Sequence, residues 1–160
     1  MASKRVAVIG ASGYGGLQTL RLLQGHPSLE VSFLGGERSS GKRWSELTPF
    51  LPLPGDPVVQ SPDPEAIAAA ADLAVLSLPN GLASTLVPPL LERGVKVVDL
   101  SADYRYSSLE QWKEVYASEA RSFPRTDADL CSEAVYGLVE CEAERIAAAR
   151  LVAAPGCFPT

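Results

Sequence analysis

Hydrophobic positions along this chain form short apolar runs that alternate with longer stretches in which apolar residues recur at helical spacing. The clearest run, 6–9, is short, rich in β-branched residues and closed by Gly10, which is typical of a buried strand. The stretch that begins at Tyr14 places Leu17 and Leu20 at helical spacing. Strands are predicted at 5–9, 30–34, 57–60 (weakly), 73–78, 96–100 and 151–154, and helices at 14–24, 64–71, 83–93, 109–117 and 142–150.

The alternation of strands and helices predicts an α/β fold, a Rossmann-like, doubly wound and mostly parallel sheet with helices on both faces. Asp63 is the expected N-cap of the helix that begins at Pro64. Pro88 and Pro89 predict a bend or break in the helix over 83–93. Two stretches are expected as connections: 35–57, with one short helix near Trp44, and the polar stretch 121–133.

Length and composition narrow the class of protein. The 160 residues suit a single domain, for which about 150 residues is typical. The formal charge of −5 shows no basic excess of the kind that nucleic-acid binders carry. No apolar run approaches the ~20 residues of a membrane helix, so neither nucleic acid nor a membrane is an expected partner. The three cysteines are too few and too irregularly spaced for a disulfide framework or a zinc site, which favours a reducing, cytoplasmic setting.

A glycine-rich turn separates the first predicted strand from the first predicted helix. Gly10, Gly13 and Gly16 lie three residues apart, a variant of the dinucleotide-binding fingerprint. Glycines permit a tight turn and a close approach to a pyrophosphate, and the helix N-terminus offers free N–H groups. The hydroxyl of Ser12 can add a contact to a phosphate oxygen. We therefore predict dinucleotide binding here; the alternative is a tight turn without a ligand.

The segment after the second predicted strand bears on the choice between NAD and NADP. Glu37 has about the spacing of the acid that holds a ribose 2′-hydroxyl. It is followed by Arg38-Ser39-Ser40-Gly41-Lys42-Arg43, whose cations and hydroxyls suit a 2′-phosphate because arginine binds phosphate through two hydrogen bonds. The prediction is NADP(H), contacted most closely by Arg38 and Ser39. The alternative is a solvated basic loop.

Cys157 follows a Pro-Gly turn at the end of the last predicted strand, where a helix is expected to start. Ligands of open α/β sheets bind at the carboxyl ends of the strands, and a helix N-terminus favours a thiolate. A thiolate next to a nicotinamide suggests attack on an activated carbonyl, a thioester and hydride transfer. A buried, inert cysteine is the alternative, and Cys131 and Cys141 have no comparable setting.

A thiol of this kind also needs a general base or acid. His26, the one histidine, falls in the turn after the first predicted helix, where the helix dipole favours it as a helix-end residue. The missing base and the abrupt end at Thr160 lead us to expect the N-terminal part of a longer enzyme, inactive by itself. A non-catalytic NADP-binding or regulatory module is the alternative that needs no truncation.

Five motifs occur in order along the whole chain. They are Gly10-Ala-Ser-Gly-Tyr-Gly-Gly16, Leu78-Pro-Asn-Gly81, Val98-Asp-Leu-Ser-Ala-Asp-Tyr-Arg105, Tyr136-Gly-Leu138 and Pro155-Gly-Cys-Phe-Pro-Thr160. With these motifs the chain resembles the N-acetyl-γ-glutamyl-phosphate reductases, NADP-dependent enzymes of arginine biosynthesis. The third and fifth motifs together are quite specific, whereas many Rossmann enzymes share the first.

The resemblance implies that NADPH reduces N-acetyl-γ-glutamyl phosphate to N-acetylglutamate 5-semialdehyde and that phosphate is released. Cys157 matches the nucleophile of the family, and Ser101 and Arg105 fall in its substrate-side stretch. Arg105 would hold the departing phosphate; an ordinary ion pair with Asp103 or a nearby acid is the alternative. The implied enzyme is a homo-oligomer without a metal. Its cofactor-binding residues here would be Gly10, Ser12, Gly13, Tyr14, Gly15, Gly16, Arg38, Ser39, Leu78, Pro79 and Asn80.

Some positions depart from the family pattern. Asn80 stands where many members have histidine, which leaves that side chain a hydrogen-bonding role. Ala154, Phe158 and Val139 replace a common asparagine, tyrosine and proline. Residues 1–154 are expected to form the NADP-binding domain and 155–160 to begin the catalytic segment, with the remaining catalytic domain absent. A sister reductase for aminoadipyl or aspartyl phosphate is the rival within the same class.

Overall fold

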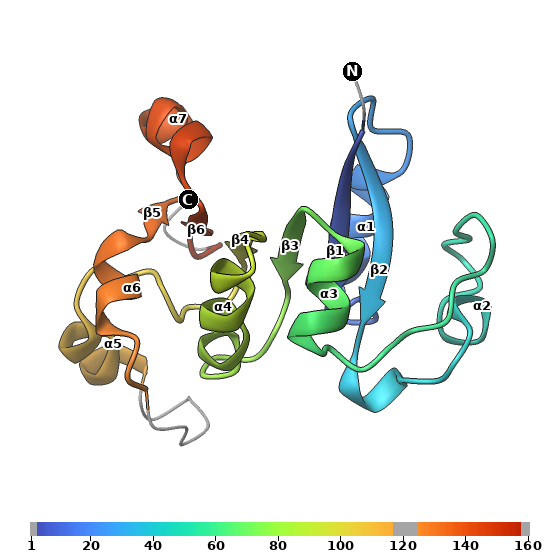
Figure 1. Cartoon of the computed structure of the whole chain (residues 1–160), viewed down its shortest axis with the longest axis horizontal. Coiled ribbons are helices and arrows are strands. Elements are labelled where there is room, and N and C mark those ends of the chain that lie inside the picture. The colour runs from blue at the N-terminus through green and yellow to red at the C-terminus, as the bar shows by residue number, and fades with distance from the viewer. Residues whose placement is uncertain (1–2, 117–124, 158–160) are drawn as a thin grey trace. The chain divides into compact units, whose positions relative to one another are not determined.

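The computed structural model describes residues 3–116 and 125–157, and the chain folds as two units, Met1–Ser77 and Leu78–Thr160. Figure 1 labels the helices and strands of both units. Each unit is built from parallel strands and the helices that connect or cover them.

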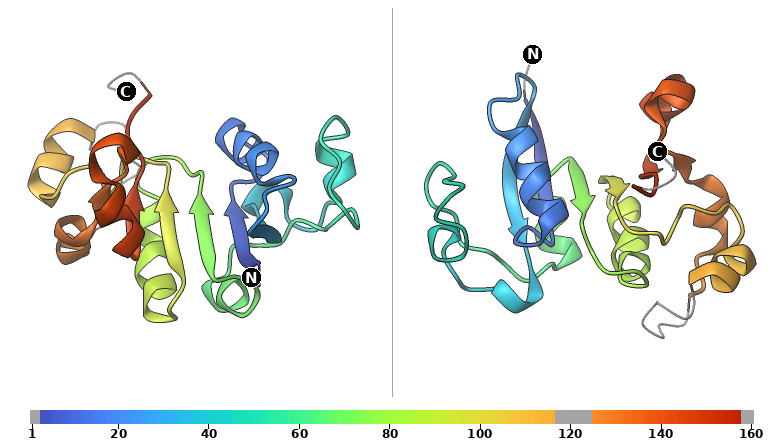
Figure 2. Two further views of the ribbon diagram at one scale, coloured as in Figure 1. Left: turned by 90° about the horizontal axis from the view of Figure 1, so that it is seen from above. Right: turned by 180° about the vertical axis from the view of Figure 1, so that it is seen from behind.

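The first unit has the strand order β2-β1-β3. Both strand pairs are parallel, and Val6 of β1 lies in register with Val31 of β2 and Leu73 of β3. The helices α1 and α3 lie on opposite faces of these strands, as the views in Figures 1 and 2 show. The bounds are β1 Lys4–Ile9, α1 Tyr14–Leu23, β2 Leu29–Gly35, α3 Pro64–Ala70 and β3 Leu73–Leu76. The predicted strands and helices of this unit are therefore confirmed, with ends that move by one or two residues.

Local chemistry explains these elements. The last four residues of β1 are completely buried, as their continuous apolar run predicts for a central parallel strand. In α3 the Asp63 carboxylate accepts a hydrogen bond from Ala66 N at 2.9 Å, and Pro64 occupies the first turn. The hydrogen bond confirms Asp63 as the predicted N-cap. Pro64 fits the first turn because a proline there loses no helical hydrogen bond. Ile67 buries the inner face of this helix.

The long connection after β2 is anchored by one tryptophan. It contains a short 3₁₀ helix, η1 (Glu37–Ser39), and α2 (Trp44–Leu47), which confirms the short helix expected near Trp44. Trp44 is completely buried, and its Nε1 donates to Leu51 O at 2.6 Å. The weak strand expected at 57–60 appears as two isolated bridges, between Gly35 and Gln60 and between Arg43 and Val58.

The second unit has the strand order β4-β6-β5, again with parallel pairs. Val97 and Leu151, which lie opposite each other on β4 and β6, belong to its core together with Leu90 of α4. The bounds are α4 Ala83–Glu92, β4 Lys96–Asp99, α5 Leu109–Tyr116, α6 Ala128–Glu133, β5 Val135–Tyr136, α7 Val139–Ala148 and β6 Leu151–Ala153.

The second unit corrects several expectations. The connection expected over 121–133 is wrong for its last part, because α6 forms there around the buried Cys131; residues 121–124 and Ala117 lie outside the described residues. The strand β5 was not predicted at all. Pro88 and Pro89 lie inside α4 without ending it, since apolar burial on both sides of them, at Val87 and Leu90, holds the helix on β4. The last helix, α7, begins three residues before the predicted start and ends two residues before the predicted end.

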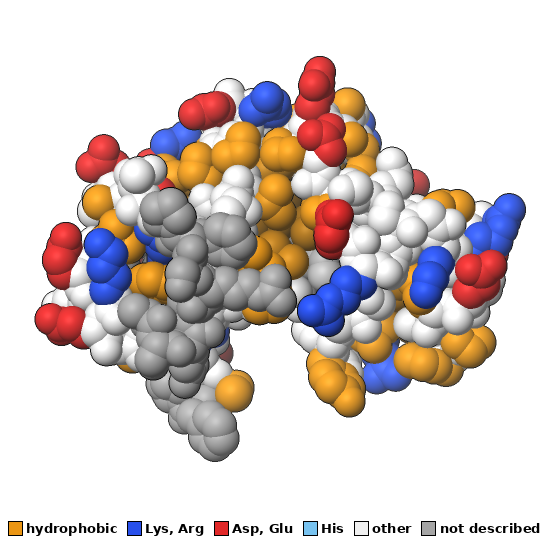
Figure 3. All heavy atoms as spheres, turned by 90° about the horizontal axis from the view of Figure 1, so that it is seen from below, with side chains coloured by type: hydrophobic (Ala, Val, Ile, Leu, Met, Phe, Trp, Pro, Cys, Tyr) orange, Lys and Arg blue, Asp and Glu red, His pale blue; other side chains and the backbone are white. Residues whose placement is uncertain are grey.

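Three further observations concern possible partners and metal ions. No helix in the described part of the chain is long and apolar enough to cross a membrane. On the face shown in Figure 3, acidic and basic side chains are interspersed. Within residues 3–116 and 125–157, no group of three or more metal-ligating side chains comes together.

Candidate functional site

The glycine turn that joins β1 to α1 has no space for a side chain at two of its glycines. Gly10 has a φ of +78°, and a Cβ there would overlap the carbonyl group of Ser77. A Cβ at Gly16 would overlap the backbone of Gly10 and Ala11. The backbone N–H groups of Gly10 and Ala11 both donate to Gly35 O, at 2.8 and 3.2 Å, which fixes the turn to the end of β2. Both positions therefore require glycine, as the fingerprint predicts.

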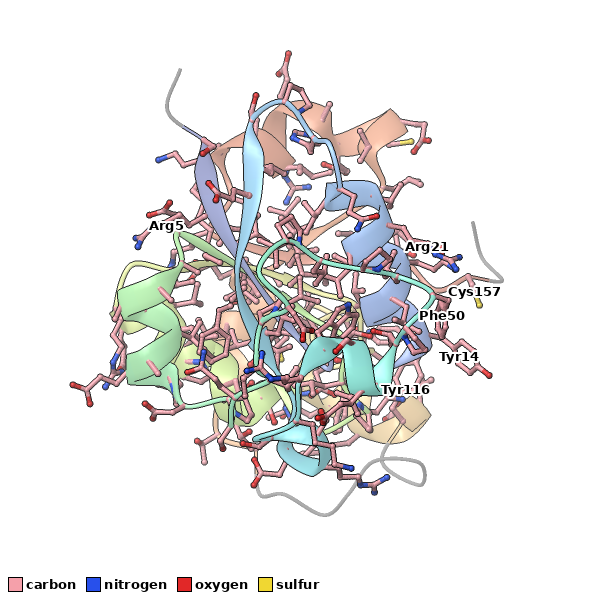
Figure 4. All side chains as sticks on the ribbon, turned by 90° about the vertical axis from the view of Figure 1, so that its right-hand side faces the viewer. Arg5, Tyr14, Arg21, Phe50, Tyr116 and Cys157 are labelled. Atoms are coloured by element: carbon pink, nitrogen blue, oxygen red, sulfur yellow. The ribbon has the colours of Figure 1, made fainter. Side chains whose placement is uncertain are left out.

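The N-terminus of α1 is open for an anion. Its N-cap is Gly13, which supplies no side-chain hydrogen bond to the first turn, so backbone N–H groups of that turn have no intrahelical or capping partner. Ser12 and Tyr14 flank this point; both are exposed, and the Tyr14 ring, 93% exposed, points away from the ribbon in Figure 4. A backbone that approaches closely and a free helix N-terminus fit the pyrophosphate of a dinucleotide.

The residues predicted to select NADP lie on η1, directly after β2. Arg38 is exposed. Ser39 is 6% exposed, and its hydroxyl donates to Gly36 O at 3.4 Å. The Glu37 carboxylate accepts a hydrogen bond from the Ser61 hydroxyl at 3.1 Å. The Glu37 carboxylate thus already accepts one hydrogen bond, and the side chains of both Glu37 and Arg38 are exposed.

In the second unit, hydrogen bonds join the loop before α4 to the loop after β4. Asn80 Oδ1 accepts from Ala102 N at 3.0 Å. The Asp103 carboxylate accepts from Gly81 N at 2.6 Å and from Ser84 N at 3.2 Å. The motif that begins at Leu78 and the motif that ends at Arg105 are therefore brought together. Leu78 is half-buried and Pro79 is exposed.

Two buried carboxylates lie at the end of β4 and in the loop after it, and the first of them, Asp99, is bonded by that loop. Ser101 donates to Asp99 from its N–H at 2.9 Å and from its hydroxyl at 2.8 Å, and the same hydroxyl accepts from Asp103 N at 3.1 Å. Burial raises the pKa of Asp99 to about 7, although the hydrogen bonds from Ser101 oppose the rise. Burial also raises the pKa of Asp103, against hydrogen bonds from Gly81 and Ser84. Hydrogen bonds to these two buried acids therefore hold the loop in place.

Arg105 connects this loop to the segment that carries Cys157. Its Nε donates to Ala154 O at 2.9 Å and its Nη2 donates to Leu100 O at 3.2 Å. Neither acceptor is a carboxylate, and no ion pair between Arg105 and an acid is found among the described residues. A guanidinium carries five N–H donors, so two bonds to carbonyl groups leave donors for an anionic ligand.

Cys157 lies in the turn after β6, and its side chain is exposed, as Figure 4 shows. The helix expected to begin here would involve residues 158–160, which lie outside the described residues. Cys131 is buried on α6 and Cys141 is exposed on α7. The Nδ1 of His26 accepts from Ser28 N at 3.1 Å in the turn after α1, as a helix-end residue would.

Comparison with known proteins assigns the family. The model of the semialdehyde dehydrogenase NAD-binding domain matches residues 5–149. The chain belongs to this family. It is 73% identical over 156 residues to the N-acetyl-γ-glutamyl-phosphate reductase of Synechococcus sp. (strain CC9605) and 69% identical to that of Prochlorococcus marinus (strain MIT 9313). Each alignment covers 98% of the chain and 44% of the relative, so the chain spans less than half the length of these curated relatives.

Solved structures also resemble this semialdehyde dehydrogenase domain. The aspartate semialdehyde dehydrogenase with NADP from Candida albicans has a TM-score of 0.58 and 31% identity, over 65% of this chain and 31% of that chain. The aspartate semialdehyde dehydrogenase II complexed with ASA from Vibrio cholerae has a TM-score of 0.65 over 98% of this chain and 42% of that chain, at 23% identity, which bears on the fold alone. The expected Rossmann-like α/β class and the expected resemblance are both confirmed.

Sequence reasoning missed residues that hold the loops of this domain in place. Asp99 was noted only as part of a motif, and Asp103 only as a possible ion-pair partner of Arg105. Their hydrogen bonds from Ser101 and from Gly81, 2 and 22 residues away, make both acids central to the loop. Arg125, described below, falls in the polar stretch expected as a connection. A single arginine in a polar stretch carries no periodic signal, so only its contacts show its importance.

Proposed function

We propose that the protein is an NADPH-dependent reductase of N-acetyl-γ-glutamyl phosphate, which forms N-acetylglutamate 5-semialdehyde and releases phosphate. The observation that carries the proposal is the hydrogen bond from Arg105 Nε to Ala154 O, because it ties a cation to the segment that carries Cys157. The names and the 73% identity of the relatives support the choice of substrate. Residues 1–154 would then form the NADP-binding domain, and 155–160 would begin the catalytic segment.

The proposed chemistry centres on the thiolate of Cys157. Its sulfur attacks the carbonyl carbon of the acyl phosphate, the C–O bond to phosphate breaks, and the acyl group remains as a thioester on the enzyme. NADPH, when bound, supplies the hydride that reduces this thioester to the aldehyde, with the thiolate as the leaving group. The exposed position of Cys157 at the end of β6 supports this role, since the carboxyl ends of parallel strands are where ligands bind.

Arg105 and Ser101 are the proposed substrate-side residues. The N–H donors of Arg105 that do not bind Ala154 or Leu100 are available to the phosphate of the substrate. A planar guanidinium suits this doubly charged group, because it can form two parallel hydrogen bonds to phosphate oxygens. Ser101 Oγ is already engaged with Asp99 and Asp103. Its contribution is therefore to hold the shape of the loop against which the substrate binds.

The cofactor is proposed to be NADP(H), held by the glycine turn and by η1. The pyrophosphate would lie over Gly10, Ser12, Gly13, Gly15 and Gly16 at the N-terminus of α1, next to the exposed Tyr14. The 2′-phosphate would be bound by Arg38, with Ser39 supporting the turn from inside. Leu78, Pro79 and Asn80 are proposed to complete the cofactor contacts. We further propose that the enzyme is a homo-oligomer and that it is cytoplasmic. The three free cysteines support the cytoplasm, because free thiols persist in a reducing compartment.

The test is the reverse reaction of the intact enzyme, followed as NADPH formation from N-acetylglutamate 5-semialdehyde, inorganic phosphate and NADP⁺. Cys157→Ser is expected to lower kcat by roughly a thousandfold or more, the scale seen when a nucleophile is removed. Cys141→Ser is the matched control, because Cys141 is also exposed but lies on α7; its kcat is expected to stay within about twofold, as for ordinary surface substitutions.

The same assay separates the alternatives. Faster turnover of aspartate semialdehyde or aminoadipate semialdehyde would replace the proposed substrate by that of a sister reductase. Tight NADPH binding with no turnover of any of the three aldehydes would indicate a non-catalytic NADP-binding module. Full activity of Cys157→Ser would remove the thioester mechanism.

A further inference from the structure

The second unit contains an arginine enclosed by protein groups on every side. The side chain of Arg125 is 2% exposed. Its guanidinium lies 4.4 Å from the ring centre of Trp112 and 5.1 Å from that of Tyr104, so two aromatic rings contact it. Asp127 faces it with a carboxylate that is 6% exposed. Such enclosure is unusual for arginine, which is mostly exposed unless it is paired.

The hydrogen bonds of Arg125 point in two directions. Toward Asp127 it forms a two-pronged pair, with Nε to Oδ1 at 3.0 Å and Nη2 to Oδ2 at 2.9 Å, and Asp127 Oδ2 also accepts from the Tyr104 hydroxyl at 2.6 Å. Toward the loop after β4, its Nη1 donates to the backbone carbonyl of Asp103 at 2.7 Å. Its Nη2 also contacts Cys131 Sγ at 3.4 Å. The guanidinium thus joins α6 to the loop that ends in Arg105.

The electrostatics of this cluster keep both charges in place. Burial opposes the charged form of Asp127, but hydrogen bonds from Arg125 and Tyr104 outweigh it, so the pKa of Asp127 lies below its ordinary value. Burial likewise opposes the charge of Arg125, and the Asp127 carboxylate raises the pKa of Arg125 nonetheless. Buried ion pairs add little stability compared with apolar packing, so stability alone is a weak reason for this arrangement.

We propose that Arg125 is a positioning residue for the anion site at Arg105. By holding the carbonyl of Asp103 from one side, while Gly81 and Ser84 hold its carboxylate from the other, it fixes the backbone two residues before Arg105. The direction in which the Arg105 guanidinium leaves the loop follows from that backbone. The proposal rests on the proposed function, in which Arg105 binds the phosphate of the substrate.

The test compares arginine-to-lysine variants of the intact enzyme in the reverse reaction. Arg125→Lys keeps the charge but loses the two-pronged geometry. It is expected to raise the KM for inorganic phosphate roughly tenfold, the scale of one charge-assisted hydrogen bond, with the KM for NADP⁺ and for the aldehyde within about twofold. Arg150→Lys is the matched control: Arg150 also forms a two-pronged pair, with Glu133, but on the surface and away from this loop. It is expected to change none of the three KM values.

Two further variants keep the proposal falsifiable. Asp127→Asn loosens the Arg125 guanidinium from the opposite side without removing its bond to Asp103, so a smaller rise in the phosphate KM is expected. This variant tests the proposal by itself if Arg125→Lys does not fold. Arg105→Lys separates the two levels of the argument. A raised phosphate KM for Arg105→Lys with an unchanged one for both cluster variants would overturn the positioning role and leave the function intact. An unchanged phosphate KM for Arg105→Lys would instead overturn the proposed role of Arg105. If the two cluster variants lowered kcat and raised all three KM values by similar factors, the cluster would have only a structural role.

Discussion

At the scale of single residues, two carboxylates, one at the end of β4 and one in the loop after it, stand out because they are completely buried. Asp99 and Asp103 both have 0% exposure. A buried carboxylate is costly unless it accepts hydrogen bonds, and Asp99 receives its bonds from Ser101, two residues away. Asp103 receives its bonds from Gly81 and Ser84, on the loop before α4 and on α4 itself. One acid therefore shapes its own loop, and the other joins two loops.

The raised pKa of Asp99 predicts a pH-dependent stability. The folded protein keeps a proton on Asp99 up to a pKa of about 7, whereas the ordinary value is 3.8. The contribution of protonated Asp99 to the free energy of unfolding is thus complete below pH 3.8 and is lost as the pH rises through 7. We expect the free energy of unfolding to fall by up to roughly 4 kcal/mol over this window, at about 1.4 kcal/mol per tenfold change in proton affinity. Urea unfolding at a series of pH values measures it.

Two variants check the assignment to Asp99. Asp99→Asn cannot ionise at this position, so its unfolding free energy is expected to fall less steeply from about pH 4 to 7 than that of the unmodified protein, with the remaining fall due to Asp103, whose pKa is also raised. Asp127→Asn is the control, because the pKa of Asp127 is lowered and its stabilisation is lost only as the pH falls below the ordinary value of 3.8. Parallel profiles for Asp99→Asn and the unmodified protein would refute the assignment.

At the scale of elements, what the sequence predicts depends on whether the signal is local. The strand β1 and the N-cap of α3 were predictable because their causes lie in neighbouring residues. The helix α6 was not, because its six residues carry one fully buried side chain, that of Cys131, and its place depends on Arg125 and Asp127. The prolines of α4 predicted a break for a local reason, and packing on β4 prevented it.

The candidate site follows the same division. The glycine turn was predictable because a tight turn and a close approach need glycine at fixed spacing. The links that shape the loop after β4 were not, because they join residues far apart: Gly81 with Asp103 across 22 positions and Arg105 with Ala154 across 49. The motifs marked these residues, and only the fold shows that they contact one another.

The connection between β2 and α3 is an element whose anchor can be tested. Trp44→Phe keeps an aromatic ring in the core but removes the bond from Nε1 to Leu51 O. We expect a loss of about 1–3 kcal/mol in unfolding free energy, because a buried carbonyl loses its partner. Trp112→Phe is the control: Trp112 is also buried, and its Nε1 has no hydrogen-bond partner within the described chain. A larger loss for Trp112→Phe than for Trp44→Phe would contradict the role of the hydrogen bond.

At the scale of the whole molecule, the chemistry is divided between the two units. The glycine turn and Arg38 belong to the first unit, whereas Arg105 and Cys157 belong to the second. The described hydrogen bonds of Arg105 all go to carbonyl groups of the second unit, and η1, which carries Arg38, is anchored within the first. Each unit therefore holds its own proposed binding residues through its own contacts.

This division predicts that the two arginines act independently. Arg38→Ala is expected to raise the KM for NADP⁺ by roughly tenfold, as one charge-assisted contact to a phosphate is lost, with the KM for inorganic phosphate unchanged. Arg105→Lys is expected to do the reverse. Because the two residues share no hydrogen-bond partner within the described residues, the effects in the double variant should combine to within about twofold of the product of the single effects. A coupling beyond that, measured in steady-state kinetics of the intact enzyme, would mean that the cofactor phosphate and the substrate phosphate depend on a common set of groups.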